Sequence, residues 1–514
     1  MICKGIVYLV GAGPGDPGLL TLRGAELLRR ADTVVYDGLV NRDLLRMAPS
    51  AAELIYGGKH GPPLPLSQEA LNALLINKAR AGKCVVRLKG GDPYVLGRGG
   101  EEAEELAKAG VPFEVVPGIS SAEAVANYAG IPLTHRAYAS SYTVVTGHGD
   151  PTTNEGRMDW SRLAQTPGTL VVLMGVKQIR SIARTLIDHG RPPSMPVAMI
   201  RRGTTGRQQT IEGNLATIAD LVDQTHFLPP AVTVIGEVVR LREKLDWFEK
   251  LPLFGQTIVV TRPIEQAEPF SHRLMELGAD VLEIPMIKTA APRDNHALAE
   301  ALVGLNSYDW IIFTSPNGVT WFFSIFFKKF QDMRDIGGVR IAAIGPATAA
   351  KLRELHLQVD IMPEEALATK VASAMVAYES IVNLRILLLR AEVATPELPK
   401  MLEELGAIVD DIPCYRTVPE TSASPEAIAK LTESGADWIS FTSGSTVQQF
   451  DEHFHLPQLI KKFPQIKLAS IGPETSKALD ALSLKPTIEA NPHTIEGMVD
   501  TLVQTSKSVA LRKT

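Results

Sequence analysis

The sequence predicts an α/β protein. Short runs of valine, isoleucine and leucine have the length of buried strands, and amphipathic stretches of helical length follow them. Several of these runs end in glycine-rich turns. In the C-terminal half a whole α/β unit occurs twice, so strands alternate with helices there, as in parallel sheets with crossover connections. Ligands of such sheets bind at the carboxyl ends of the strands.

Length and composition limit the number of domains and the classes of protein to which this chain can belong. The 514 residues suffice for two to four domains. Hydrophobic residues make up 45% and charged residues 21%, which excludes wholesale disorder. The net charge of −5 argues against a broad nucleic-acid-binding surface but leaves room for a local basic pocket. Cys3, Cys84 and Cys414 are too few and too scattered for a disulfide framework or a CxxC metal site, which predicts a reducing compartment.

No apolar stretch reaches the ~18 residues that a membrane-spanning helix needs. The opening run Ile6–Val10 is too short for a signal peptide and is predicted to be a buried strand. The sequence therefore predicts a cytoplasmic protein.

The N-terminal half is predicted to contain two subdomains. The first begins with a strand, a glycine-rich turn, a helix and a second strand, at Ile6–Val10, Val10–Gly18, Leu22–Arg30 and Thr33–Tyr36. A proline-rich break around Thr134–Thr153 separates it from a second group of strands, at Leu170–Gly175, Pro196–Ile200 and Ala231–Val239. We predict a domain over residues 1–240 and a charged, aromatic linker over 241–254.

The first turn has two interpretations. Gly11 and Gly13 fit the dinucleotide fingerprint GxGxxG, and Asp37 follows at the distance expected of a ribose-binding carboxylate. However, Asp16 occupies the third glycine position, and Pro14 lacks an amide that would face a pyrophosphate. The dinucleotide fingerprint therefore fails. A GxGxG pattern would suit a Rossmann-type S-adenosylmethionine enzyme, which has a single nucleotide loop.

Two further turns are equally marked. RLKGGDPYVLGRGGEE (Arg87–Glu102) follows the strand Cys84–Leu88, and VPGISSAEA (Val115–Ala124) again leads from a strand to a helix. Glycines let the backbone approach a ligand closely, and Asp92 can bind a ribose hydroxyl or an amine. Three such turns suggest a nucleoside held in a folded conformation.

The motifs GAGPGDPGLLTLRG, VVYDGLV, RLKGGDPYVLGRGGEE, VPGISSA and YAGIPLTHR resemble the uroporphyrinogen-III C-methyltransferase family, one of the tetrapyrrole methyltransferases. The resemblance covers about residues 5–240. It implies a two-subdomain α/β fold with S-adenosylmethionine in the cleft between the subdomains. It also implies methylation of uroporphyrinogen III at C2 and C7 to give precorrin-2, and a homodimer formed through this half.

The resemblance assigns roles to individual residues. The family's general base matches Asp37, and its general acid matches Lys59 of GGKH. Once the pyrrole carbon has attacked the methyl group a proton must leave the ring system, and a carboxylate can take it; a lysine can donate a proton or hold a substrate carboxylate. The pair Ser120–Ser121 departs mildly from the Thr-Ala common in relatives. The S-adenosylmethionine pocket is expected to use Pro14, Gly90, Gly91, Asp92, Val95, Ser120, Ser121, Met174, Gly203 and Ala231.

Uroporphyrinogen carries eight carboxylates, so its pocket must be basic despite the net charge of the chain. Arg87, Lys89 and Arg136 are the candidates for binding them, with Arg98, Arg201 and Arg202 as further ones. Alternatively, this half methylates a later corrin intermediate. The YDGLV and RLKGGDP motifs favour the earlier substrate.

The C-terminal half is a duplication. At an offset of 128 residues, Gln256–Pro263 matches Leu384–Ala391, Leu274–Thr289 matches Leu402–Thr417, and Asp309–Val319 matches Asp437–Val447. At an offset of 127, Ile341–Leu352 matches Leu468–Leu479. Two similar α/β lobes predict a cleft between them.

This half resembles uroporphyrinogen-III synthase through VVTRP, FTSPNGV, IGPATA, FTSGSTV and IGPETS, over about Leu253–Thr514. The resemblance implies two lobes joined by a two-stranded hinge within residues 255–514. Lobe one would comprise about 255–287 plus 418–514, and lobe two about 292–413. The implied reaction closes hydroxymethylbilane to uroporphyrinogen III with inversion of the last ring, and it uses no cofactor.

Loss of the substrate hydroxyl leaves a stabilised cation, so holding the folded chain matters more than strong acids or bases. Tyr415 matches the family's tyrosine near the hinge and is a candidate proton donor. The two histidines of DEHFHLP lack further ligands, so no metal is predicted. Side chains at the strand ends that can hold propionates are Thr314, Ser315, Asn317, Thr348, Thr442, Ser443 and Thr475.

The two resemblances support each other, because the product of the second enzyme is the substrate of the first. We therefore predict a fusion of two consecutive steps of tetrapyrrole synthesis, with small molecules rather than nucleic acids or membranes as partners. An alternative makes the C-terminal half a ligand sensor that regulates the methyltransferase. A sensor would bind a tetrapyrrole without converting hydroxymethylbilane.

Overall fold

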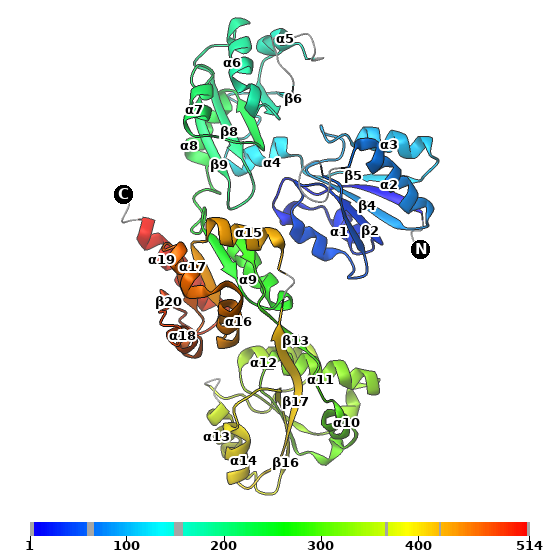
Figure 1. Cartoon of the computed structure of the whole chain (residues 1–514), viewed down its shortest axis with the longest axis vertical. Helices are drawn as coiled ribbons and strands as arrows, with labels where there is room; N and C mark the ends of the chain where they lie inside the picture. The colour runs from blue at the N-terminus through cyan, green and yellow to red at the C-terminus, as the bar shows by residue number, and fades with distance from the viewer. Residues whose placement is uncertain (1–4, 59–65, 149–157, 365–367, 421–422, 511–514) are drawn as a thin grey trace. The chain divides into compact units, whose positions relative to one another are not determined.

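The structure is a computed structural model that describes residues 5–58, 66–148, 158–364, 368–420 and 423–510 (Figure 1). The described residues form four five-stranded sheets. Contacts divide the chain into two compact units, Met1–Ile258 with His272–Val281 and Val499–Thr514, and Val259–Ser271 with Leu282–Met498. None of the described helices has the length and apolar character that crossing a membrane requires.

The first sheet has the order β3-β2-β4-β1-β5, and its strand pairs are parallel. Tyr8 and Val10 of β1 point into one apolar core, while Val7 and Leu9 point into another, so both faces of the sheet are covered. Its strands are β1 (Ile6–Gly11), β2 (Thr33–Tyr36), β3 (Glu53–Tyr56), β4 (Cys84–Lys89) and β5 (Phe113–Val116). Its helices are α1 (Leu22–Leu28), α2 (Gln68–Arg80) and α3 (Gly99–Lys108).

The second sheet, β6-β7-β10-β8-β9, is mixed: β10 runs antiparallel to both of its neighbours, and β6 and β7 are parallel. Helix α4 (Ser121–Tyr128) packs its buried alanines and Val125 against this sheet. The predicted division of the N-terminal half into two α/β subdomains is confirmed. The strands are β6 (Tyr142–Thr146), β7 (Thr169–Leu173), β8 (Pro196–Arg201), β9 (Gln209–Asn214) and β10 (Ala231–Ile235), with helices α5 (Trp160–Gln165), α6 (Ile179–Asp188) and α7 (Ile218–Gln224).

The segment 241–254, predicted as a linker, is folded against the N-terminal half. It begins with the short helix α8 (Arg242–Leu245). Arg242 donates to the Ala129 carbonyl at 2.7 Å and to Glu249 at 2.7 Å. The Trp247 indole donates to the Asn127 carbonyl at 3.1 Å. We call this segment the strap, because its contacts hold it to α4 and the adjoining turn.

The two remaining sheets belong to the duplicated half. Lobe one has the order β12-β11-β18-β19-β20 and lobe two the order β13-β17-β16-β14-β15. The strands of lobe one are β11 (Thr257–Val260), β12 (Asp280–Glu283), β18 (Trp438–Phe441), β19 (Lys467–Ser470) and β20 (Ile488–Glu489). Those of lobe two are β13 (Ile287–Ala290), β14 (Trp310–Phe313), β15 (Arg340–Ala343), β16 (Arg385–Ala391) and β17 (Ile408–Pro419).

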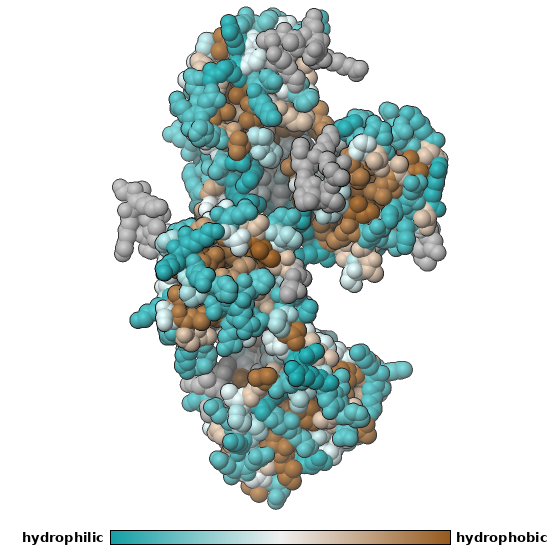
Figure 2. Space-filling model, viewed as in Figure 1, coloured by the Kyte–Doolittle hydropathy of each residue, from teal (hydrophilic) through white to brown (hydrophobic). Residues whose placement is uncertain are grey.

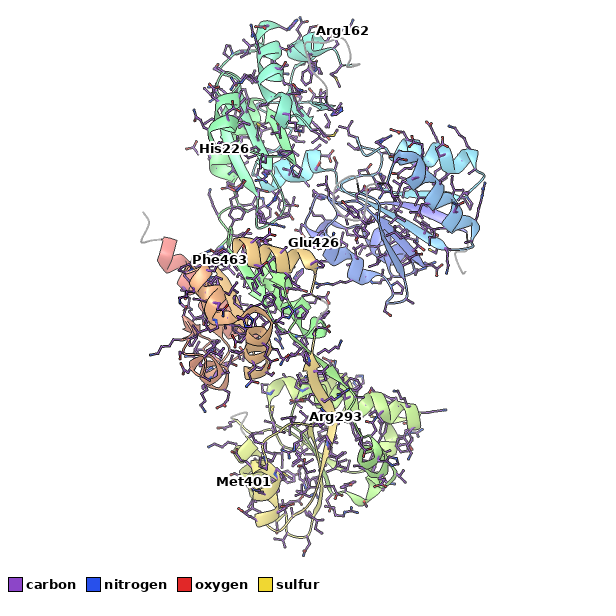
Figure 3. The ribbon with its side chains drawn as sticks, in the orientation of Figure 1. Arg162, His226, Arg293, Met401, Glu426 and Phe463 are labelled. Atoms are coloured by element: carbon purple, nitrogen blue, oxygen red, sulfur yellow. The ribbon has the colours of Figure 1, made fainter. Side chains whose placement is uncertain are left out.

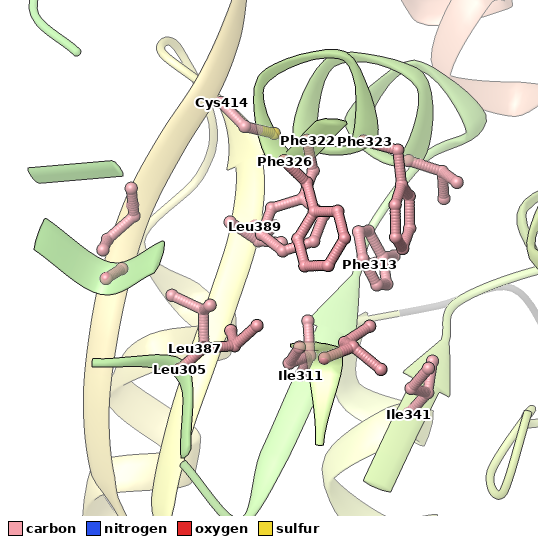
Figure 4. Close-up of a cluster of buried hydrophobic side chains, with 14 of the residues drawn as sticks. Leu305, Ile311, Phe313, Phe322, Phe323, Phe326, Ile341, Leu387, Leu389 and Cys414 are labelled. Carbon is pink, nitrogen blue, oxygen red and sulfur yellow. The ribbon is translucent and has the colours of Figure 1, made fainter. Parts of the chain in front are cut away.

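Helices cover these sheets, and Phe322, Phe323 and Phe326 of α11 pack onto Phe313 in the core of lobe two (Figure 4). The helices are α9 (Ile264–Glu276), α10 (His296–Val303), α11 (Pro316–Lys329), α12 (Pro346–Glu354), α13 (Ala368–Tyr378), α14 (Glu397–Glu404), α15 (Pro425–Ser434), α16 (Gly444–Phe454), α17 (Leu456–Lys462), α18 (Pro473–Asp480) and α19 (Ile495–Ala510). On the face that Figure 2 shows, hydrophilic residues predominate and the apolar ones form scattered patches.

A two-stranded hinge connects the lobes. β17 runs parallel to β16 and then, from Arg416 to Pro419, antiparallel to β13. Arg293, labelled in Figure 3, follows β13, and its backbone N–H donates to Glu392 at 3.1 Å. The polypeptide of lobe two is thus inserted between β12 and β18 of lobe one.

Candidate functional site

The three glycine-rich turns of the N-terminal half meet at the carboxyl ends of β1, β4 and β5. Gly91 N donates to Gly13 O at 2.7 Å, and Gly13 N donates back to Gly91 O at 3.3 Å. A Cβ on Gly118 would lie 2.3 Å from Gly91 O, and one on Gly11 would lie 2.4 Å from the Gly118 Cα. The turns therefore touch backbone to backbone, and side chains at these positions would separate them.

Asp92 fastens the second turn to the third. Its Oδ2 accepts from Gly118 N at 3.0 Å and its Oδ1 accepts from Tyr94 N at 2.8 Å. Each carboxylate oxygen keeps a further lone pair, which can accept from a hydroxyl or an amine. The predicted ligand-binding role of Asp92 is compatible with this geometry.

The other predicted cofactor residues lie on these turns and on the second sheet. Ser120 is buried and caps α4 by accepting from Ala122 N at 3.2 Å. Gly203 packs against Val125, since a Cβ there would lie 2.5 Å from Val125 Cγ1. Ala231 pairs with Arg201 across β10 and β8. Pro14 and Gly90 belong to the turns themselves, and Ser121 opens α4.

Apolar side chains are left exposed on the second and third turns and at the end of β7. Val95, Ile119 and Met174 are 41%, 40% and 53% exposed, and Met174 has the unusual φ of 59°. These apolar side chains can cover an adenine, and the carboxylate of Asp92 can accept a hydrogen bond from a ribose hydroxyl. The residues present thus fit S-adenosylmethionine.

Asp16, which broke the dinucleotide fingerprint, connects the two subdomains. It accepts from the Tyr128 hydroxyl at 2.7 Å, and its backbone N–H donates to Thr204 Oγ1 at 3.1 Å. The Tyr128 ring packs on Trp247 and Phe248 of the strap, with centroids 5.1 and 4.8 Å apart. Burial and the hydrogen bond to Asp16 raise the pKa of Tyr128. The sequence analysis missed Tyr128, because no motif near Tyr128 indicates that its partner Asp16 lies 112 positions away in the chain.

Asp37 lies at one end of a network of charged side chains, most of which are buried. Arg87 and Lys89 lie on the same face of β4, each 2% exposed. Arg87 donates to Asp37 at 2.5 Å, and Lys89 donates to Glu102 at 2.9 Å. Glu102 is 1% exposed, and its Oε2 has no hydrogen-bond partner among the described residues. Burial and the neighbouring Arg87 lower the pKa of Lys89.

This network changes how the predicted basic residues can act. Arg87 and Lys89 are engaged by protein carboxylates, so contact with a substrate would require the substrate to replace Asp37 or Glu102. Arg87 also holds Asp37 at the carboxyl edge of the first sheet, where the Asp37 side chain is 28% exposed. Arg136 lies exposed between β5 and β6. Lys59 lies outside the described residues.

In lobe two the structure brings Tyr415, Ser315 and Asn317 together. The hydroxyls of Tyr415 and Ser315 are 3.0 Å apart, and Ser315 also caps α11 by accepting from Gly318 N at 3.1 Å. Burial raises the pKa of Tyr415, partly opposed by hydrogen bonds to Ser315 and Asn317. Thr314 donates to the Leu389 carbonyl at 3.2 Å, and Thr348 is buried in α12.

Lobe one presents a comparable set of hydroxyls after β18 and β19. Ser443 caps α16 by accepting from Thr446 N at 3.3 Å, and its hydroxyl lies 3.0 Å from that of Ser445. Thr442 directly follows β18, and Thr475 is buried in α18. A cavity of about 290 Å³ adjoins the hinge, and its lining includes Thr417–Pro419, Ala391, Val393, Ser445 and Gln448.

Two family models match the chain. The model described as Tetrapyrrole (Corrin/Porphyrin) Methylases matches residues 6–219, and that of Uroporphyrinogen-III synthase HemD matches residues 268–500. The crystal structure of uroporphyrin-III C-methyl transferase from Thermus thermophilus complexed with S-adenyl homocysteine is 44% identical, with a TM-score of 0.40, over 46% of this chain and 99% of that one.

Curated relatives extend the match along the whole chain. The porphyrin biosynthesis protein HemD of Ruminiclostridium josui is 37% identical over 97% of this chain and 98% of its own length. The uroporphyrinogen-III C-methyltransferase of Bacillus subtilis is 40% identical over 71% of this chain and 75% of its own length. The chain therefore belongs to the HemD family of porphyrin biosynthesis proteins and carries a tetrapyrrole methylase domain followed by a uroporphyrinogen-III synthase domain.

Proposed function

We propose that this chain closes hydroxymethylbilane to uroporphyrinogen III and methylates the product at C2 and C7 to give precorrin-2. The observation that carries the proposal is that both matched domains occur in one chain. A curated relative matches that chain over nearly its whole length. Two of the relatives whose match includes the N-terminal half are named for uroporphyrinogen III, which favours this substrate over a later corrin intermediate.

In the methyltransferase half, S-adenosylmethionine supplies the methyl group from its sulfonium centre. The joined turns and Asp92 align the donor, and alignment is the larger part of such catalysis. Asp37, held by Arg87, takes the proton that the tetrapyrrole must lose elsewhere on its ring system once the pyrrole carbon has been methylated. Lys59 is proposed as the acid or as a ligand of a substrate carboxylate. We further propose that this half forms a homodimer and that the chain acts in the cytoplasm.

In the synthase half, Tyr415 donates a proton to the departing hydroxyl of hydroxymethylbilane. Ser315 and Asn317 fix the orientation of its hydroxyl, and burial keeps that hydroxyl protonated by raising its pKa. The hydroxyls at the strand ends hold the propionates while the last ring inverts. No cofactor is needed for this loss of water and ring closure.

One anaerobic incubation tests both activities. The purified chain is given hydroxymethylbilane and methyl-labelled S-adenosylmethionine, and the products are separated and counted. Two labelled methyl groups on a type-III skeleton are expected. Asp37→Asn should stop labelling but still give uroporphyrinogen III, whereas Tyr415→Phe should need added uroporphyrinogen III for rapid labelling.

Label that appears only with preformed uroporphyrinogen III in the wild type would contradict the synthase activity. It would favour a C-terminal half that senses tetrapyrroles without converting them. No label under either condition would contradict the proposed methyl acceptor.

A further inference from the structure

Arg262, at the carboxyl end of β11, is a cation that has no anionic partner among the described residues. Its Nε is buried and has no hydrogen-bond acceptor among the described residues. The other end of the guanidinium donates to Gln266 Oε1 at 3.0 Å. No carboxylate among the described residues lies within ion-pair distance of it, and Gln266 is neutral.

This arrangement is unfavourable without a ligand. Taking a guanidinium out of water costs free energy that a neutral amide only partly returns. Burial accordingly lowers the pKa of Arg262, and the more distant Glu496 opposes the shift. A bound anion would supply the missing charge and an acceptor for a buried N–H.

The surroundings of Arg262 suit an anion. The preceding residue, Thr261, is fixed by its hydroxyl, which donates to the Ser440 carbonyl of the neighbouring strand β18 at 2.8 Å. The carboxyl end of β11 therefore lies beside the start of α16, where free backbone N–H groups and the Ser443 and Ser445 hydroxyls can also bind negative groups.

We propose that Arg262 binds a carboxylate of the linear tetrapyrrole that the synthase half converts. The proposal rests on the proposed function, because that function supplies the acidic ligand. Gln266 also connects Arg262 to the second lobe, because its Nε2 donates to Asn317 Oδ1 at 2.6 Å.

The test compares full-length Arg262→Gln with Arg273→Gln, which changes an exposed arginine of α9. Conversion of hydroxymethylbilane is followed at several concentrations, and melting is recorded with and without it. For Arg262→Gln we expect KM to rise about 10- to 100-fold with a smaller change in kcat. The melting temperature without ligand should stay equal or rise, because an uncompensated buried charge has been removed. Arg262→Lys should recover part of the affinity, and Arg273→Gln should match the wild type.

An unchanged KM in Arg262→Gln would overturn the proposal. A raised KM accompanied by a lower melting temperature without ligand would also overturn it, since a structural role would then explain the loss. If the wild type did not convert hydroxymethylbilane, the proposed function would fail separately. The stabilisation by hydroxymethylbilane would still decide: equal shifts in the wild type and Arg262→Gln overturn ligand binding by Arg262, and a smaller shift in the variant supports it.

Discussion

The two copies of the duplicated unit hold the same arginine in different electrostatic surroundings. Arg390 occupies in lobe two the position of Arg262 in lobe one. Its guanidinium forms a two-pronged ion pair with Asp411 and also donates to the Thr395 carbonyl. Among the residues that the structure describes, Arg262 has only the side-chain amide of Gln266 as a hydrogen-bond partner. One copy has kept the arginine as part of its framework, and the other leaves it available to a ligand.

A second difference concerns the hinge strands. Tyr415 in the second copy of the repeat corresponds to Ile287 in the first copy, and Cys414 corresponds to Met286. All four side chains are buried, so the duplication has preserved the packing of these positions and changed their chemistry. The proton donor proposed for the synthase therefore exists in one copy of the repeat alone.

The largest effect should come from Tyr415→Phe. Removing a proton donor should lower kcat for hydroxymethylbilane about 100-fold. Quenched samples separated by isomer would measure it. Tyr308→Phe is the control, because Tyr308 donates its hydroxyl to Asp410 at the opposite end of the strands and should leave kcat unchanged. Normal turnover by Tyr415→Phe would assign the proton to another group.

Asp411→Asn should destabilise lobe two. It leaves Arg390, whose side chain is 13% exposed, without its anion, and because Asp411 is 33% exposed we expect a loss of only about 1–2 kcal/mol. Hydrogen exchange of lobe-two peptides would measure the loss. Arg262→Gln should leave exchange of lobe-one peptides as slow as in the wild type. Equal losses in both lobes would remove the distinction between the two arginines.

Lobe two should also be the more sensitive to alkali. Burial raises the pKa of the Cys414 thiol from 9.0 to about 12, so this thiol stays protonated in the folded lobe and ionises on unfolding. The stability it contributes is complete well below pH 9 and is lost as the pH rises toward 12, by up to about 1.4 kcal/mol per pH unit, so that about 1.4 kcal/mol has been lost at pH 10. Urea unfolding at pH 8, 9 and 10 would measure this slope. Cys414→Ala should flatten it, and an equal slope in that variant would refute the role of the thiol.

The smallest effects should come from the two helix caps. Ser315→Ala and Ser443→Ala each remove one cap and should each cost about 1 kcal/mol. Only Ser315 also contacts Tyr415, so Ser315→Ala should lower synthase kcat a few-fold more than Ser443→Ala does. Equal rates in the two variants would show that the contact does not orient the tyrosine.

The sequence predicts the fold well where hydrophobic periodicity and turn residues indicate the local structure. The three glycine-rich turns, the two N-terminal subdomains and the repeat all follow from local patterns, because buried strands and glycine turns leave short-range signatures. The meeting of Tyr415 with Ser315, 100 residues apart, follows no such pattern. It depends on β17 lying beside α11 in the folded lobe.

The charges were harder to predict. Arg87 and Lys89 stand next to a glycine-rich turn, so they are expected to meet substrate, yet they point into a core where Glu102 compensates them. Arg262 and Arg390 follow similar apolar runs and are indistinguishable in sequence. Whether a cation is neutralised depends on which carboxylate the fold brings within reach, and a single sequence does not show this.

The insertion of lobe two into lobe one also sets an order of folding during synthesis. β11 and β12 leave the ribosome before all of lobe two, while their neighbour β18 follows it. At about 5–20 residues per second, the first two strands of lobe one wait roughly 10–30 seconds for that neighbour. Lobe two can complete its sheet within this interval. The nascent chain thus builds the lobe that contains Tyr415 first and closes the lobe that contains Arg262 last.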